Sequence, residues 1–278
     1  MSRLYPFLVA GLPDLVPDMD AKGFRLSALK AEIDEMLAEA DHEALRWMFH
    51  PADNHNLLYL LQANGTWLPF GNYTMEEMQD RMTAIEDLPA YMTVFLEGYT
   101  GKDPGRPERI RSGCPEKDLL EDFYAAAQEH TMPFVREWFV FDMELRDAVA
   151  ALILRKHEAE IESGLIGEGD VPDALKSSNA ADFGLKQARW WMEPLVQIME
   201  IPNVLEREQK LDLLRWQQLD SMTEMHHFDI FNVLAFVQKA LIVNRWMQWD
   251  EAAGQALFRE WIAATRGALD LQQAFTMN

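Results

Sequence analysis

The sequence predicts an all-α protein, on three observations of composition and pattern. Leu (34) and Ala (31) together number 65, twice the 32 of Val, Ile and Thr combined. Leu and Ala lose little conformational entropy in helices, whereas β-branched residues favour strands. No run alternates polar and apolar residues as a half-buried strand would. Apolar residues instead recur at steps of three and four, which is the period of a helix.

The expected helices follow one another through most of the chain. A lead-in over 1–26 contains Pro6, Pro13 and Pro17, each of which discourages a helix. Asn64-Gly65 ends one helix, Thr74 opens another with a capping box, and Pro133 kinks or splits a third. Helices are expected over 27–48, 53–63, 74–85, 89–100, 116–163, 180–199, 202–225, 229–246 and 250–266.

Two segments rich in Gly, Pro and polar residues, 100–116 and 163–178, are expected to be loops. They divide the chain into a first helical module over 1–100, a second over 101–178 with its flanking loops, and a third over 179–278. The 278 residues suffice for one large domain or for two to three small ones. We expect a multi-helix assembly of about three similar helical bundles.

A weak internal repeat supports that division. Asp53, Asp142 and Asp229 are spaced 89 and 87 residues apart, and each precedes a strongly apolar segment. We expect each Asp at or near a helix start, where its carboxylate accepts orphan backbone N–H groups. Asn56 and Asn232 follow the first and third of them by three residues. Because Asp is a common N-cap, chance can also produce the pattern.

The charge balance excludes several classes of function. Acidic residues outnumber basic ones 46 to 25, which gives a net charge of −21. A nucleic-acid binder or a protein docked on anionic lipid needs a basic surface instead. No stretch approaches the roughly 20 apolar residues of a membrane helix, so we expect no direct membrane insertion. The single cysteine, Cys114, excludes an internal disulfide framework and indicates a reducing, cytoplasmic setting. The acidic runs are solvated helix faces or, alternatively, a surface for a basic partner.

One metal-binding pattern has two interpretations. Glu39 and His42, and again Glu224 and His227, form E-x-x-H pairs on or beside expected helices. Such pairs supply ligands in di-iron helical bundles, because residues three apart share a helix face. Solvated surface charge is the simpler interpretation. The sequence has neither a phosphate-binding glycine loop nor a nucleophile elbow, so we expect no cofactor and no enzymatic activity.

Motifs near both ends resemble one bacterial family. The first is YPFLVAGLPD over 5–14, and the second is LDLLRWQQLD over 211–220. The third is FDIFNVLAF over 228–236, followed by NRW over 244–246. Genes of that family typically lie among those of the V/A-type ATP synthase, where the gene for its C subunit is expected.

The resemblance implies a fold and a role. The C subunit, called d in eukaryotes, is an all-helical, three-part funnel that couples the central stalk to the membrane rotor ring. Its D-x-x-N-L segments are similar to residues 53–57 and 229–233 here, whereas Leu145 stands where the middle copy would have Asn. The resemblance thus implies a non-catalytic coupling protein, cytoplasmic and peripheral to the inner membrane. Its partners would be the stalk subunits and the rotor ring, and a generic helical adaptor is the other open interpretation.

Overall fold

The computed structural model describes residues 3–15, 25–99 and 114–247, and the regular elements of this part are all helices. The one β-type contact in it is an isolated bridge between Leu4 and Asp229. The predicted all-α class is therefore confirmed. The helices are α1 (Pro6–Gly11), α2 (Leu26–Met36), α3 (Glu39–Gln62), α4 (Met75–Ala84), α5 (Ala90–Tyr99), α6 (Pro115–Gln128), α7 (Pro133–Lys156), the short 3-10 helix η2 (Ile161–Gly164), α8 (Asp170–Ser177), α9 (Met192–Met199), α10 (Val204–Thr223) and a last helix described over 230–247.

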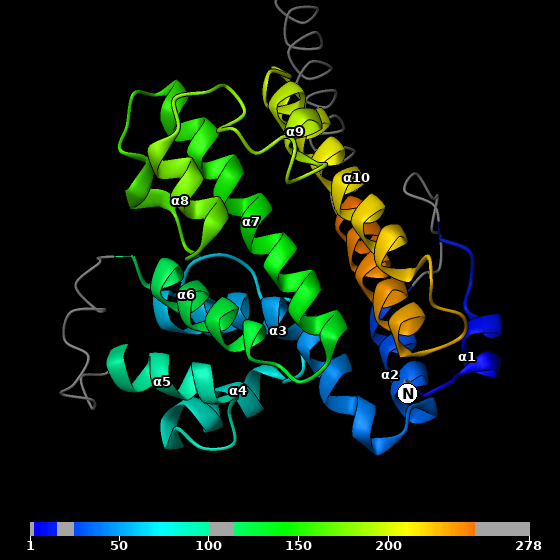
Figure 1. The fold of residues 1–278 in the computed structure, drawn as a ribbon. Helices are drawn as coiled ribbons and strands as arrows, with labels where there is room; N and C mark the ends of the chain where they lie inside the picture. Colours follow the sequence, from blue (N-terminus) through cyan, green and yellow to red (C-terminus); the bar gives the residue numbers. More distant parts are fainter. Residues whose placement is uncertain (1–2, 16–24, 100–113, 248–278) are drawn as a thin grey trace, which may run out of the picture.

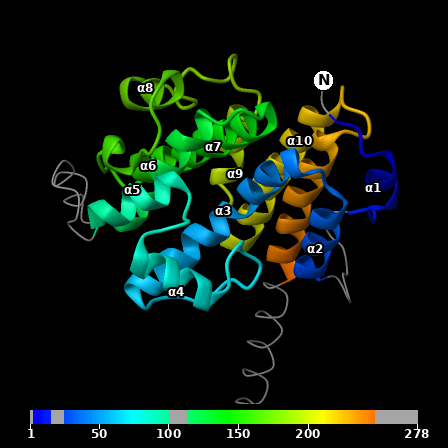
Figure 2. The ribbon, with the colours of Figure 1, turned by 90° about the horizontal axis from the view of Figure 1, so that it is seen from below.

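Helix α7 occupies the middle of the molecule, where it packs against α6, α8, α9 and α10 (Figure 1). Helix α3 packs against α4, α6 and α7. Near the start of the chain, α2 lies beside the helix over 230–247 in both ribbon views (Figures 1 and 2). Two helices near the two ends of the described chain are therefore neighbours in space, although about 200 residues separate them in the sequence.

One hydrophobic core runs through the described residues, from Tyr5 to Ile242. Its aromatic centre surrounds Trp47, whose ring centroid lies 5.8 Å from that of Phe123 and 6.3 Å from that of Phe139. Aromatic contacts of this kind stabilise a core beyond the area that they bury. The core includes side chains from all three predicted modules, and the division into modules at 100 and 178 stays a prediction.

Several predicted boundaries agree with the structure. The capping box is present, since Glu77 N–H donates to Thr74 Oγ1 and the Glu77 carboxylate accepts from Thr74 N–H. Pro133 splits the long predicted helix and stands in the first turn of α7, where its missing N–H costs nothing. Helices α5 and α10 also match their predicted ranges closely. The expected helix over 250–266 and most of the loop over 100–116 lie outside the described residues.

The prediction of separate helices over 27–48 and 53–63 is wrong. The chain breaks earlier, between Met36 and Glu39, and α3 then continues through Pro51 to Gln62. At the break Ala38 has an extended backbone, and its N–H donates to Tyr5 Oη at 3.2 Å. A proline inside a helix removes one hydrogen bond, and tertiary packing can outweigh that loss.

Three further expectations are corrected. The lead-in contains α1, because Pro6 occupies its first turn. The segment predicted as a loop over 163–178 contains α8, an amphipathic helix that buries Val171 and Leu175. Of the helix predicted over 180–199, only α9 forms, since Phe183 and Gly184 have left-handed φ angles of 54° and 77° that no helix continues.

Helices α3 and α7 match in length and in one buried carboxylate. Each has 24 residues, and Asp53 and Asp147 both lie 14 positions after the first residue of their helix. Asp53 Oδ1 accepts from Asn72 N–H at 2.7 Å, and Asp147 Oδ1 accepts from Ile166 N–H at 2.9 Å. Both bonds reach 19 residues along the chain, and both Asp residues are fully buried. Each carboxylate therefore holds the loop that follows its own helix.

This correspondence overturns the predicted placement of two repeat residues at helix starts. Asp53 and Asp142 lie inside α3 and α7, and the structural counterpart of Asp53 is Asp147 rather than Asp142. Asp229 alone precedes a helix, where it accepts from Phe231 N–H at 3.0 Å. Asn232 Oδ1 accepts from Asp229 N–H at 3.2 Å, which completes this cap.

Asn56 strengthens the first of the two loop contacts. Its side-chain amide donates to Leu68 O at 2.9 Å and accepts from Leu68 N–H at 2.8 Å. The D-x-x-N pair of α3 is thus a device that binds the loop over 63–74, because both side chains point to the same face of the helix.

Replacing Asp147 by Ala should lower the free energy of unfolding by about 2–4 kcal/mol, since the N–H groups of Ile166 and Gly167 lose their shared acceptor. The matched control is Glu137→Ala on the exposed face of the same helix, which should change it by less than about 0.5 kcal/mol. Urea unfolding followed by circular dichroism measures both. Equal effects of the two substitutions would contradict the role given to Asp147.

Candidate functional site

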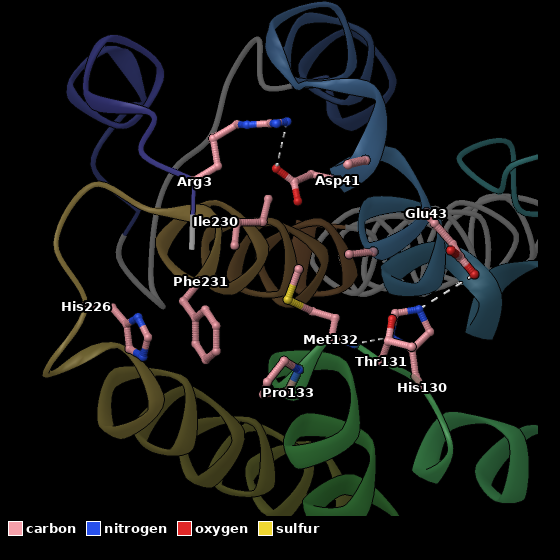
Figure 3. Close-up of a pocket in the computed structure, with 12 residues that line it drawn as sticks. Arg3, Asp41, Glu43, His130, Thr131, Met132, Pro133, His226, Ile230 and Phe231 are labelled. Carbon is pink, nitrogen blue, oxygen red and sulfur yellow. Dashed lines mark hydrogen bonds and ion pairs between the residues drawn. The ribbon is translucent and has the colours of Figure 1, made fainter. Parts of the chain in front are cut away.

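The amino-terminal ends of three long helices open on one pocket of about 710 Å³ (Figure 3). The helices are α3, α7 and the one over 230–247, and the N-terminal segment adds a fourth wall. The residues that line the pocket are Arg3, Ala40, Asp41, Glu43, Ala44, His130, Thr131, Met132, Pro133, His226, Ile230 and Phe231. Backbone N–H groups at helix starts carry partial positive charge, and the pocket lining also holds the carboxylates of Asp41 and Glu43 and the guanidinium of Arg3.

The N-terminal motif over 5–14 fastens two of these helix starts together. The hydroxyl of Tyr5 donates to Asp41 of α3, and Tyr5 N–H donates to Phe228 O at 2.5 Å, just before the last helix. Arg3 also faces Asp41, at 3.8 Å (Figure 3). Burial and the neighbouring Asp41 carboxylate raise the pKa of Tyr5, so its hydroxyl stays a donor.

The start of the last helix is held by a short polar cluster. Asp229 Oδ2 lies 2.7 Å from His226 Nδ1, while its other oxygen caps the helix through Phe231 N–H. The imidazole of His226 stacks on the Phe231 ring with centroids 3.8 Å apart and planes 5° apart. One carboxylate thus orders both the helix start and the histidine that lines the pocket.

His130 occupies the loop before α7 and is the most enclosed titratable side chain of the pocket. Its side chain is 8% exposed, and its Nδ1 accepts from Met132 N–H at 3.0 Å. Burial lowers the pKa of this imidazole, so it is neutral near pH 7 and carries its proton on Nε2. Among the residues that the structure describes, Nε2 has no hydrogen-bond partner, and Glu43 Oε1, at 3.8 Å, is too far away to accept its proton.

Away from the pocket lining, the LDLLRWQQLD motif contributes a buried network of ion pairs. Arg215 of α10 donates from Nε to Asp142 at 3.1 Å and from Nη1 to Asp212 at 3.3 Å. Tyr124 of α6 donates its hydroxyl to the other oxygen of Asp142 at 2.8 Å. Although burial alone would lower the pKa of Arg215, the two carboxylates raise it, so the guanidinium stays charged.

The NRW motif, on the last helix, adds further contacts to this network of ion pairs. Asp212 is fully buried and accepts from Trp246 Nε1 at 2.7 Å and from Arg245 Nε at 3.1 Å. Arg245 Nη2 donates to the same carboxylate. Two guanidinium groups therefore balance Asp142 and Asp212, and the contacts join α6, α7, α10 and the last helix.

Replacing Arg215 by Met keeps most of the apolar stem but removes the charge between Asp142 and Asp212. We expect the free energy of unfolding to fall by about 3–5 kcal/mol, because one partner of a buried ion pair is lost. Chemical denaturation measures the change. Arg207→Met on the same helix is the matched control and should be nearly neutral. If Arg215→Met lowers the free energy of unfolding by less than about 1 kcal/mol, these ion pairs do not stabilise the fold.

The four residues of the metal-binding alternative are not gathered into one site. Glu39 is the first residue of α3, while Glu224 follows the end of α10 and His227 lies in the next loop. His42 already has two contacts, with Leu37 O at 3.2 Å and with Asp34 at 3.2 Å. Among the residues that the structure describes, no group of three or more His, Cys, Asp or Glu side chains is arranged to hold a metal ion.

Reasoning from the sequence missed three residues of this region. Asp147 had a signal, since it stands between Met143 and Ala151 on an otherwise buried face of α7. Asp212 lies in the LDLLRWQQLD motif, but its partners are 3 to 34 residues away along the chain. His130 had no signal, because its burial depends on Trp47, whose ring lies 5.2 Å away.

Asp53 gives the fold a specific pH dependence. Burial raises the pKa of its carboxyl to about 6, although the bonds from Asn72 and the nearby Lys30 oppose the shift. A folded-state pKa above the unfolded value means that the native state binds the proton more tightly. This contribution to stability is therefore present at low pH and is lost as pH rises through 6.

Between pH 7 and pH 5, Asp53 should raise the free energy of unfolding by about 1 kcal/mol. The measurement is the difference between wild type and Asp53→Asn in urea titrations at both pH values, which cancels the other carboxylates. The free energy of unfolding of wild type minus that of Asp53→Asn should rise by that amount from pH 7 to pH 5. A difference that is the same at both pH values would contradict the raised pKa of Asp53.

The geometry identifies the structural class of this protein: it is all-helical, with an open pocket where three helices begin. The chain belongs to a family described as a protein of unknown function, DUF2764, whose model matches residues 1–267. That description does not mention ATP synthase. Neither the comparison with curated proteins nor that with solved structures gives a match. In the described part of the chain, no helix is both long and apolar enough to cross a bilayer.

Proposed function

We propose that this chain is a non-catalytic coupling component of a V/A-type ATPase that links the central stalk to the membrane rotor ring during ion transport. The observation that carries the proposal is the pocket on which α3, α7 and the helix over 230–247 begin. A helical body made of three similar parts around an opening is the architecture that the resemblance implies. The common length and Asp position of α3 and α7 support it.

The motifs behind the resemblance support the proposal through their positions. The segment over 5–14 ties the start of α3 to the loop before the last helix, at the rim of the pocket. The segments over 211–220 and 244–246 meet in the buried ion pairs around Asp212. These motifs therefore maintain the shape of the opening.

In the proposed mechanism, the end of the stalk enters the pocket while another face rests on the cytoplasmic loops of the ring. The chain is thus peripheral to the inner membrane and held there through the ATPase complex. Torque passes through packed helices, so the required property is rigidity. Buried ion pairs between α7, α10 and the helix over 230–247 resist sliding, because separating them leaves uncompensated charge. The net charge of −21 favours association with basic partner surfaces.

The test is isolation of a tagged chain from detergent-solubilised membranes of the native host, read by mass spectrometry. We expect stalk and ring proteins in fixed stoichiometry. Ala40→Arg, at an exposed position that lines the pocket, should reduce recovered stalk proteins about tenfold. Ala31→Arg, at an exposed position of α2 that does not line the pocket, is the matched control and should leave recovery unchanged.

Recovery of the tagged chain alone, in detergent that keeps the ATPase intact, would refute the coupling role. Recovery of a different, defined assembly would favour the generic helical adaptor. If Ala40→Arg and Ala31→Arg recover the stalk equally, the coupling role survives but the stalk does not dock in the pocket.

A further inference from the structure

A second pocket, of about 470 Å³, lies between the end of α7, helix α9 and the start of α10. That volume is within the range of pockets that bind small molecules. Arg155, Lys156 and Arg207 line it with positive charge, and Glu200 is the one carboxylate among its described lining residues. With His157 neutral, the lining has a formal charge of +2, whereas the whole chain carries −21.

The three cations of this pocket are not neutralised within the described part of the chain. There, no carboxylate forms an ion pair with Arg155, Lys156 or Arg207. By contrast, Arg189 pairs with Glu144 at 2.6 Å. Three like charges that converge on one pocket repel one another, so an anion bound between them is favoured.

Arg155 is held in a fixed position at the wall of the pocket. Its Nη1 donates to Ala180 O at 2.6 Å, and its Nη2 donates to Ser178 O at 2.8 Å. The guanidinium also lies 3.5 Å from the centroid of the Phe183 ring. Burial lowers the pKa of Arg155, but an arginine stays charged at neutral pH. The pocket therefore contains a positive charge whose place is set before any ligand arrives.

Helix dipoles explain only part of this charge. Arg155 and Lys156 lie in the last turn of α7, where a cation is favourable. Arg207 lies near the start of α10, where the same effect disfavours a cation. The last carbonyls of α7 already accept backbone N–H groups from the turn that follows. What the three cations have in common is the pocket.

The other side of the pocket is apolar. Leu152 and Ile153 of α7 and Val196 and Met199 of α9 line it. Ile153 is 41% exposed, so a large apolar side chain is accessible beside the cations. A charged side and an apolar side within one pocket suit an organic anion better than an inorganic ion.

We propose that this pocket binds a phosphate monoester that carries an apolar group. A phosphate monoester has a charge of about −1.5 to −2 near pH 7, which matches the formal charge of the lining. Its oxygens accept hydrogen bonds from Lys156 and Arg207, and its apolar group contacts Ile153 and Val196. The site is separate from the pocket at the three helix starts and does not depend on assembly with an ATPase, so either proposal can fail without the other.

The experiment titrates the full chain, labelled with ¹⁵N, and follows its backbone amides by NMR at pH 7.5 and constant ionic strength. The probes are phenyl phosphate, inorganic phosphate and, as a neutral aromatic compound, benzyl alcohol. We expect phenyl phosphate to cause a saturable shift of signals over 152–157 and 196–207. Inorganic phosphate should bind about tenfold more weakly, because it lacks the apolar group, and benzyl alcohol should cause no saturable shift.

Three variants and one control test the residues. Lys156→Gln and Arg207→Gln should each weaken the binding of phenyl phosphate about fivefold, whereas Glu200→Gln should tighten it about threefold by removing a like charge. Lys176→Gln, on α8 and outside this pocket, is the matched control and should change the affinity less than about twofold. Lys156 and Glu200 are exposed, so their variants keep the fold.

No saturable shift, an equal response to benzyl alcohol, or an affinity unchanged in both Lys156→Gln and Glu200→Gln would overturn the proposal. Equal binding of inorganic phosphate and phenyl phosphate would also overturn it, because the apolar side would then contribute nothing.

A free small molecule and a phosphorylated tyrosine of a partner protein present the same group. A pentapeptide with a central phosphotyrosine between glycines distinguishes these sources. Binding of the peptide about tenfold tighter than that of phenyl phosphate supports a side chain of a partner, whereas equal or weaker binding supports a small molecule.

Discussion

Compensation of three helix N-termini is the constraint on which the pocket depends. Each N-terminus carries roughly half a positive elementary charge, so bringing three together is unfavourable unless acceptors are supplied. Acidic side chains in the first turn supply them for α3, and Asp229 supplies one for the helix over 230–247. The start of α7 has no such residue, and the nearby His130 accepts the Met132 N–H through Nδ1. The polar organisation of the pocket follows from this asymmetry.

Buried carboxylates hold the rest of the structure around that pocket. Asp53 and Asp147 bind the loops that follow their own helices, and Asp212 joins two guanidinium groups and an indole from different turns. A buried carboxylate is stable only when its oxygens are all engaged, so each of these residues dictates the position of distant backbone or side chains. Removing any of them leaves buried donors without acceptors.

Family membership and the coupling proposal have different foundations. Membership in the family of unknown function follows from a match over residues 1–267. The coupling role is our proposal, supported by motif resemblance and by the matching Asp contacts in α3 and α7. A helical body with a pocket at three helix starts suits either a mechanical coupling role or an adaptor role, and the isolation experiment distinguishes them.

The sequence by itself determined the all-α class, because composition and helical period depend only on local conformational preferences. It also determined the local signals, such as the capping box at Thr74 and the start of α7 at Pro133. Only the tertiary structure decided that α3 continues through Pro51 and that Asp147, rather than Asp142, is the counterpart of Asp53. It alone buried His130 beside the pocket. The physical reason is that long-range packing and hydrogen bonds between distant segments outweigh local propensity, and neither can be read from spacing along one chain.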